Sequence, residues 1–331
     1  MSGKCDVIVV GAGPAGAMAA NVLGAAGCRV LVLEQHRLPR YKPCAGGVPS
    51  GLFAALPAPC SEAIERRVTR VRFRLGREEA CHELGGASVA LVSRERFDHL
   101  FVGQAQATVH DGERVTGIED SPGGVEVVTS RGGRYRADYL IGADGAFSTV
   151  ARLAGLRGKR AVGPALAAEV HVPADLLERY ADACLFLLGT VRRGYAWLFP
   201  KSDHLSLGIG SLSESRGVLR PRLLEVARQL GLPLEAVRPR GHGLPLYRHG
   251  EPLHRARILL AGDAGGLMDP FSGEGIRHAV HSGRLAADAI LTGQVPQYTE
   301  RVRREIGRHL QGAFVLGRVF HASQRLSFSL G

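Results

Sequence analysis

A glycine-rich turn near the N-terminus is the feature that most constrains the fold of this chain. An apolar run at 7–10 leads into Gly-Ala-Gly-Pro-Ala-Gly at 11–16, and the small residues at 17–26 predict a helix. A second apolar run at 30–33 ends at Glu34. This order is typical of two buried parallel strands joined by a crossover helix.

Such a turn is suited to binding a dinucleotide. Its glycines let backbone N–H groups approach a pyrophosphate, whose charge is favoured at a helix N-terminus. An acid at the end of the second strand can accept hydrogen bonds from ribose hydroxyls. The residues that we expect to bind in this way are Gly11, Gly13, Gly16 and Glu34.

Two further glycine turns follow apolar strands at 142–145 and 262–266. They place Asp144 and Asp263 where ligands collect in open α/β sheets, so both are candidate cofactor-binding residues, and Asp263 can hydrogen-bond a ribityl hydroxyl. Residues 270–276 open a helix whose N-terminal amides suit the N1–C2=O edge of a flavin. A nicotinamide dehydrogenase usually needs one such turn, so three in this order favour FAD.

The pattern of strands and helices predicts an α/β fold that is interrupted by antiparallel strands. We expect a Rossmann-type FAD-binding domain with an inserted, mostly antiparallel β-sheet substrate domain and C-terminal helices. The predicted FAD-binding domain takes residues 1–67, 93–158 and 251–297. The predicted substrate domain takes 68–92 and 159–250, and 298–331 form a C-terminal helical segment.

Several motifs together resemble a known family. The three glycine turns and Arg94-x-x-Phe97-Asp98 resemble flavoproteins of the para-hydroxybenzoate hydroxylase superfamily. Arg-Tyr-Lys-Pro-Cys-Ala-Gly-Gly at 40–47 and Gly-Tyr-Ala-Trp-Leu-Phe-Pro-Lys at 194–201 are similar to the geranylgeranyl reductase family within it. The resemblance implies bound FAD at the following positions: Ala15, Glu34, Cys44, Ala45, Gly47, Arg94, Asp263, Gly275 and Ile276.

The alternation at 195–200 puts Tyr195, Trp197 and Phe199 on one face of a strand. By pattern alone this is a core strand. The resemblance implies instead that Tyr195, Trp197, Phe199 and Pro200 line a tunnel for a prenyl chain, for which aromatic walls are suitable.

The reaction implied by the resemblance is the reduction of C=C bonds in a geranylgeranyl or related polyprenyl lipid. It needs a hydride from flavin N5 and a proton from the protein or water. The candidate proton donors are Cys44 and Tyr195, with Cys44 ahead, although a free Cys is more often an inert buried residue. The electron donor is left open between NADPH, a ferredoxin and a quinol.

An alternative function is a flavin-dependent monooxygenase or halogenase that acts on an aromatic or polyketide compound. The same superfamily fold carries out that chemistry. The strand at 195–200 also loosely resembles the halogenase Trp-x-Trp-x-Ile-Pro motif, without its first Trp.

The charge balance limits the partners. Lys and Arg number 42 against 31 acidic residues, giving a net charge of +11. This charge suits nucleic acid, an anionic membrane surface or an acidic ligand. A flavin-containing RNA-binding protein is a third reading, but no dense basic tract is interleaved with aromatics, so we expect no nucleic-acid partner.

The remaining signals concern location and metals. No stretch of about twenty residues is apolar and uncharged, and no secretory signal precedes the first strand. The six Cys lack metal or CxxC spacing, which predicts reduced thiols. We therefore expect a cytoplasmic protein with transient contact at the inner membrane face. No metal is expected, and His278 and His281 are interpreted as surface or packing residues of a helix.

Overall fold

The chain forms two compact units in the computed structural model, which describes residues 4–322. Among these residues, unit 1 consists of 4–40, 98–161 and 245–312, and unit 2 consists of 41–97, 162–244 and 313–322. Residues 1–3 and 323–331, the ends of the predicted first and last segments, lie outside the described residues.

The largest differences between these units and the predicted domain limits lie at 41–67 and 298–312. Residues 41–67 were assigned to the FAD-binding domain but group with unit 2, because β3 (Gly47–Pro49) and β4 (Ile64–Val68) pair with β7 (Val89–Val92). Residues 298–312 were assigned to a separate C-terminal segment but group with unit 1. The roles given to the predicted domains stay predictions.

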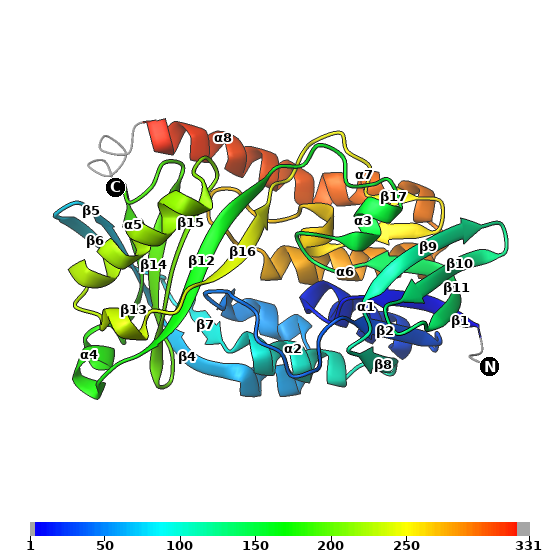
Figure 1. Ribbon diagram of the computed structural model, residues 1–331, viewed down its shortest axis with the longest axis horizontal. Coiled ribbons are helices and arrows are strands. Elements are labelled where there is room, and N and C mark those ends of the chain that lie inside the picture. The colour runs from blue at the N-terminus through cyan, green and yellow to red at the C-terminus, as the bar shows by residue number, and fades with distance from the viewer. Residues whose placement is uncertain (1–3, 323–331) are drawn as a thin grey trace. The chain divides into compact units, whose positions relative to one another are not determined.

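Unit 1 is built on a sheet with the strand order β17-β18-β11-β1-β2-β8, to which β10 and β9 add a hairpin (Figure 1). The expected parallel pairing of the first two apolar runs is confirmed, since Val7 pairs with Val30 and Val10 with Leu33. The strands of this sheet are β1 (Cys5–Val10), β2 (Val30–Glu34), β8 (Thr108–Asp111), β9 (Val115–Ser121), β10 (Gly124–Thr129), β11 (Arg134–Gly142), β17 (His254–Arg255) and β18 (Ile258–Leu260).

Helix α1 packs on β1 and β2, helix α3 packs on β9, and α6 packs on α1. Close packing between α1 and α6 needs Gly283, because a Cβ at that position would lie 2.2 Å from the carbonyl oxygen of Ala15. The helices are α1 (Pro14–Ala25), α2 (Arg94–Gly103), α3 (Thr149–Leu153), α6 (Ile276–Leu291), α7 (Tyr298–Val302), a π-helical turn (Arg303–Gly307) and α8 (Arg308–Ala322). Of these, α2 and α8 each have residues in both units.

Unit 2 holds a seven-stranded sheet with the order β16-β12-β15-β14-β13-β5-β6 and the small sheet β3-β7-β4. Neighbours from β12 to β13 and the β5–β6 hairpin are antiparallel, and β13–β5 is parallel, so the predicted mostly antiparallel sheet is confirmed. Its strands and helices are β5 (Arg70–Leu75), β6 (Glu78–Glu83), β12 (Val162–His171), β13 (Ala183–Leu188), β14 (Gly194–Pro200), β15 (His204–Ser211), β16 (Arg240–Pro245), α4 (Ala174–Arg179) and α5 (Arg216–Gln229).

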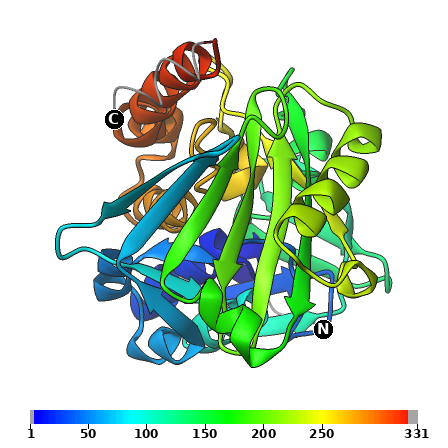
Figure 2. The same ribbon diagram turned by 90° about the vertical axis from the view of Figure 1, so that its left-hand side faces the viewer.

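The two faces of this sheet differ. Helix α5 packs against β12 and β15 (Figure 2), and Ala196 and Leu198 of β14 belong to the aliphatic core formed there. Tyr195, Trp197 and Phe199 alternate with those residues and so lie on the opposite face. None of the helices among the described residues is both long enough and apolar enough to cross a bilayer.

Candidate functional site

The first glycine turn in unit 1 forms a cradle between β1 and α1. Gly11 has φ +103°, and a Cβ there would lie 2.3 Å from the carbonyl oxygen of Ala143. A Cβ at Gly16 would lie 1.9 Å from the oxygen of Gly11. At Gly13 the nearest atom to such a Cβ is on the Arg40 side chain, at 3.7 Å. Gly11 and Gly16 are thus required by the fold itself, whereas Gly13 leaves space beside the backbone.

The N-terminus of α1 is open to an anion. Gly13 is its N-cap residue, and within the described chain no side chain caps the helix and no acidic residue occupies its first turn. The N–H groups of that turn therefore point toward the space at Gly13, where the helix dipole favours negative charge.

Glu34 lies at the carboxyl end of β2, where it is only 3% exposed. Its carboxylate accepts hydrogen bonds of 3.0 Å from the N–H groups of Ala12 and His36. Arg40 forms ion pairs with it, at 3.3 Å, and with buried Asp98, at 3.1 Å. This network holds the glycine turn to the end of β2.

The other two glycine turns lie beside the first. Gly11 lies against Ala143 of the second turn, and a Cβ at Gly262 of the third would lie 3.0 Å from that of Ala15. A Cβ at Gly275 would lie 3.6 Å from Oδ1 of Asp263. Gly275 is the N-cap residue of α6, which no side chain of the described residues caps, and Ile276 is its first residue.

Asp144 has a local role. It accepts hydrogen bonds from the backbone N–H groups of Thr149 (2.7 Å) and Val150 (3.1 Å) and from the Ser148 hydroxyl, so it caps α3. Burial raises the pKa of this carboxyl, although these hydrogen bonds act in the opposite direction. Its contribution to cofactor binding stays a prediction.

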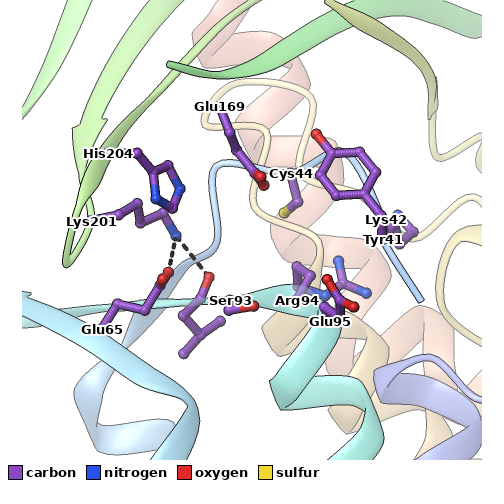
Figure 3. A pocket seen from close by; sticks show the side chains of 11 residues that line it. Tyr41, Lys42, Cys44, Glu65, Ser93, Arg94, Glu95, Glu169, Lys201 and His204 are labelled. Atoms are coloured by element: carbon purple, nitrogen blue, oxygen red, sulfur yellow. Dashed lines mark hydrogen bonds and ion pairs between the residues drawn. The ribbon is translucent and has the colours of Figure 1, made fainter. Parts of the chain in front are cut away.

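Unit 2 contains a small polar cavity of about 50 Å³ (Figure 3), which has room for water but not for a lipid chain. It brings together Cys44 and Arg94, two of the predicted cofactor-binding residues. The complete lining is Tyr41, Lys42, Cys44, Glu65, Val92, Ser93, Arg94, Glu95, Glu169, Lys201 and His204.

Lys201 is one of the buried cations of this cavity, with 3% of its surface exposed. Its ammonium donates a hydrogen bond of 2.7 Å to the carbonyl of Val92 and lies 3.5 Å from the Glu65 carboxylate (Figure 3). Burial lowers the pKa of Lys201, although the Glu65 charge acts to raise it. A Cβ at Gly46 would lie 2.6 Å from the ammonium and 2.3 Å from the Val92 oxygen, so glycine at 46 lets the lysine cross the loop.

The Cys44 thiol is activated by its surroundings. Burial acts to raise its pKa, but the positive charges of Arg94 and Lys42 and the Gly46 N–H oppose it and leave the pKa below the ordinary value. Because a lowered pKa makes the thiol a better acid, this Cys is suited to proton transfer.

The aromatic side chains of β14 extend into a larger cluster in unit 2. Tyr195 contacts Phe186 edge-on at 5.3 Å between ring centroids, and Phe186 contacts Phe199 at 5.2 Å. Trp197 lies 6.3 Å from Tyr195. We call this set, with Phe73 stacked on Phe186 at 5.4 Å, the aromatic face.

The Cys44 loop packs onto the aromatic face. Ala45 belongs to the cluster around Phe199, and a Cβ at Gly47 would lie 3.2 Å from the Phe199 ring. Pro200 is buried where β14 ends, directly before Lys201.

Four residues of the cavity were given no role from the sequence. Lys201 was noted only as the last residue of the motif at 194–201, and Glu65, Glu169 and His204 were missed. The available signal for Lys201 was that this residue, one of only four Lys, directly follows the aromatic strand. No local pattern marked the other three.

Comparison with known proteins identifies the cofactor. Residues 4–204 match the FAD binding domain family. An uncharacterized protein of Methanosarcina barkeri is 31% identical over 99% of this chain and 86% of its own length. The chloroplastic geranylgeranyl diphosphate reductase of Arabidopsis thaliana is 30% identical over 88% of this chain, which spans only 66% of that protein.

Solved structures share the fold. A geranylgeranyl bacteriochlorophyll reductase-like protein from Thermoplasma acidophilum has a TM-score of 0.81 at 24% identity, covering 96% of this chain and 88% of that one. p-Nitrophenol 4-monooxygenase from Pseudomonas putida has a TM-score of 0.74 at 21% identity, with coverages of 95% and 89%. The fold alone therefore does not choose between reduction and oxygenation.

The cradle in unit 1 fits the ADP half of FAD, and Gly13 tests this fit. We expect Gly13→Ala to leave the melting temperature of the FAD-free protein nearly unchanged, because the added methyl would make only an ordinary contact with the Arg40 side chain, at 3.7 Å. The same methyl would occupy the room that a pyrophosphate needs, so FAD affinity should fall by at least about tenfold, or about 1.4 kcal/mol. FAD fluorescence quenching measures this affinity. Gly103→Ala, where the added methyl meets open space, is the control, and equal affinity in both variants would contradict the assignment.

The lowered pKa of Cys44 can be measured by alkylation as a function of pH, with peptide mass spectrometry reading each Cys. The midpoint for Cys44 should fall below the ordinary value of 9.0. Arg94→Gln should move it upward, because the thiolate loses its strongest neighbouring cation. Arg96→Gln, exposed on the same helix, should leave it unchanged. A midpoint above 9.0 in the wild type would refute this description of the site.

Proposed function

Because this chain belongs to the geranylgeranyl reductase family of FAD-dependent oxidoreductases, we propose that it reduces C=C bonds of a geranylgeranyl or related polyprenyl lipid. The bond reduced gains one hydride and one proton. The relatives named for such activity include a geranylgeranyl diphosphate reductase and a digeranylgeranylglycerophospholipid reductase. We propose a substrate of this class without naming its head group.

The observation that supports the proposal most is the aromatic face. Phe73, Phe186, Tyr195 and Trp197 are each only partly buried, although they form a continuous cluster of rings. A polyisoprenoid offers apolar surface and π electrons alone, so rings are suitable contacts for it. An aromatic substrate would also stack there, but it would need polar groups to fix its orientation.

Reduced FAD, when bound, supplies the hydride from its N5 atom. The glycine cradle and the start of α1 would hold the pyrophosphate, and Glu34 the ribose. We propose that Cys44 gives the proton to the second carbon of the bond. The thiolate that remains is stabilised by Arg94 and Lys42 and takes a new proton from water in the polar cavity.

Lys201 and Glu65 have a positioning role in this proposal. Their ion pair and the Lys201 hydrogen bond to Val92 hold the backbone at Gly46, two residues from the thiol. The electron donor that reduces FAD again stays open between NADPH, a ferredoxin and a quinol.

Transient contact with an anionic membrane surface is also part of the proposal. Helix α8 leaves the apolar residues Val315, Leu316 and Val319 more than half exposed. The stripe of Val302, Ile306 and Leu310 is buried instead and is packing. Co-sedimentation with anionic vesicles, weakened by salt, measures this contact.

The test of the reaction uses enzyme reduced with dithionite under anaerobic conditions and a geranylgeranyl substrate. The product should gain two hydrogens per bond, as read by mass spectrometry. Cys44→Ser should lower the turnover rate measured at saturating FAD by about 10² or more, since general acids contribute on that scale. Tyr195→Phe, which keeps the ring, should retain most activity. A loss in Tyr195→Phe alone would reassign the donor, and no gain of hydrogen with any polyprenyl substrate would overturn the proposal.

A further inference from the structure

Three side chains in unit 1 outside the proposed chemistry form a cluster, which we call the His–Asp cluster: Asp269, His278 and His309. Asp269 precedes the loop that leads into α6, His278 lies in the first turn of α6, and His309 lies at the start of α8. One ligand atom from each residue lies within 4.8 Å of the other two. Such a set of two imidazoles and one carboxylate is typical of transition-metal sites.

A second observation, independent of the distances within the cluster, supports a ligand at His278. This residue is 2% exposed, and its Nε2 has no hydrogen-bond partner among the described residues. Leaving a buried polar nitrogen without a partner is costly, so native structures rarely do so. A ligand at this nitrogen would remove that cost.

Asp269 and His309 are already placed as two ligands would be. Oδ2 of Asp269 lies 3.2 Å from Nε2 of His309. Two ligands at about 2.0–2.1 Å from a tetrahedral zinc ion lie about 3.3 Å apart. Oδ1 of Asp269 accepts hydrogen bonds of 2.8 and 2.9 Å from the N–H groups of Phe271 and Ser272, which orient the carboxylate. Oδ2 is hydrogen-bonded to Nε2 of His309 in the metal-free protein, and a bound ion would replace this hydrogen bond.

We propose that Asp269, His278 and His309 bind one divalent transition-metal ion, with Zn²⁺ as the best match. Imidazole nitrogens argue against Ca²⁺ and Mg²⁺, which prefer oxygen ligands. The His309 side chain is 55% exposed, so an ion can enter from solvent, and a fourth position stays open to water. The neighbouring Arg277 is paired with Glu274 through two hydrogen bonds of 2.9 Å, which offsets its charge.

The role of this metal is structural. It would join the start of α8 to the first turn of α6 and to the loop before it. That loop ends at Gly275, a predicted FAD position, so the ion would restrain the backbone there. The site takes no part in the proposed hydride and proton transfer, and either assignment can fail without the other.

The test uses the full chain with any affinity tag removed, stripped of metal by chelator and dialysis. Zn²⁺ is titrated by calorimetry against a competing chelator, and Co²⁺ is added separately for its visible absorption. We expect one Zn²⁺ per chain and a rise in melting temperature on binding, because the ion binds the native state.

His309→Ala is the decisive variant, because this side chain is exposed and its loss spares the core. It should weaken Zn²⁺ binding by at least about tenfold, since losing even an outer partner of a ligand costs that much, and it should abolish the thermal shift. Asp269→Asn, which keeps the Oδ1 acceptor, should weaken binding as well.

His281→Ala is the matched control, on the same helix and engaged with Glu305 at 3.1 Å, and it should bind as the wild type does. Dependence on His309 also separates the site from binding at the six free Cys. Absence of binding, or equal affinity in the wild type and His309→Ala, would overturn the proposal.

Discussion

Backbone segments in unit 1 cross at distances that only glycine permits, and the nucleotide cradle depends on these crossings. Gly16 lies over the carbonyl of Gly11, Gly11 lies over that of Ala143, and Gly283 lies over that of Ala15. Together they bring the turn after β1 against the turn after β11 and hold α6 against α1. A methyl group at any of these glycines would meet a backbone oxygen at 2.3 Å or less, which no side-chain movement can relieve.

In unit 2, the position of the Cys44 loop depends on the buried side chain of Lys201. Burying an ammonium costs several kcal/mol after relaxation, and the Lys201 contacts with Glu65 and Val92 offset that cost. The same lysine fixes the loop at Gly46, and the loop carries Cys44 into a cavity where cations lower its pKa. A structural ion pair and a thiol of lowered pKa thus share one polar cavity in unit 2.

The sequence predicted what local patterns encode. The strand–glycine–helix order predicted the parallel pairing of β1 and β2. The alternation at 195–199 predicted that the rings of Tyr195, Trp197 and Phe199 share one face of the sheet. The sequence did not reveal Glu65 as the partner of Lys201, because Glu65 lies in β4 and Lys201 directly follows β14, far away in the chain. The three members of the His–Asp cluster likewise meet only through folding. From the sequence, His278 and His281 were interpreted as surface or packing residues of a helix, because no nearby carboxylate or thiol pattern completed a metal site.

The central claim is that electrons pass from reduced flavin directly to a carbon–carbon double bond. Anaerobic stopped-flow absorbance tests it most directly, with reduced enzyme mixed with a geranylgeranyl compound in the strict absence of oxygen. The account predicts that the oxidised flavin spectrum returns at a rate that rises with substrate concentration. Flavin that stays reduced until oxygen is admitted, and then passes through an oxygen adduct, would contradict it and favour a monooxygenase or halogenase.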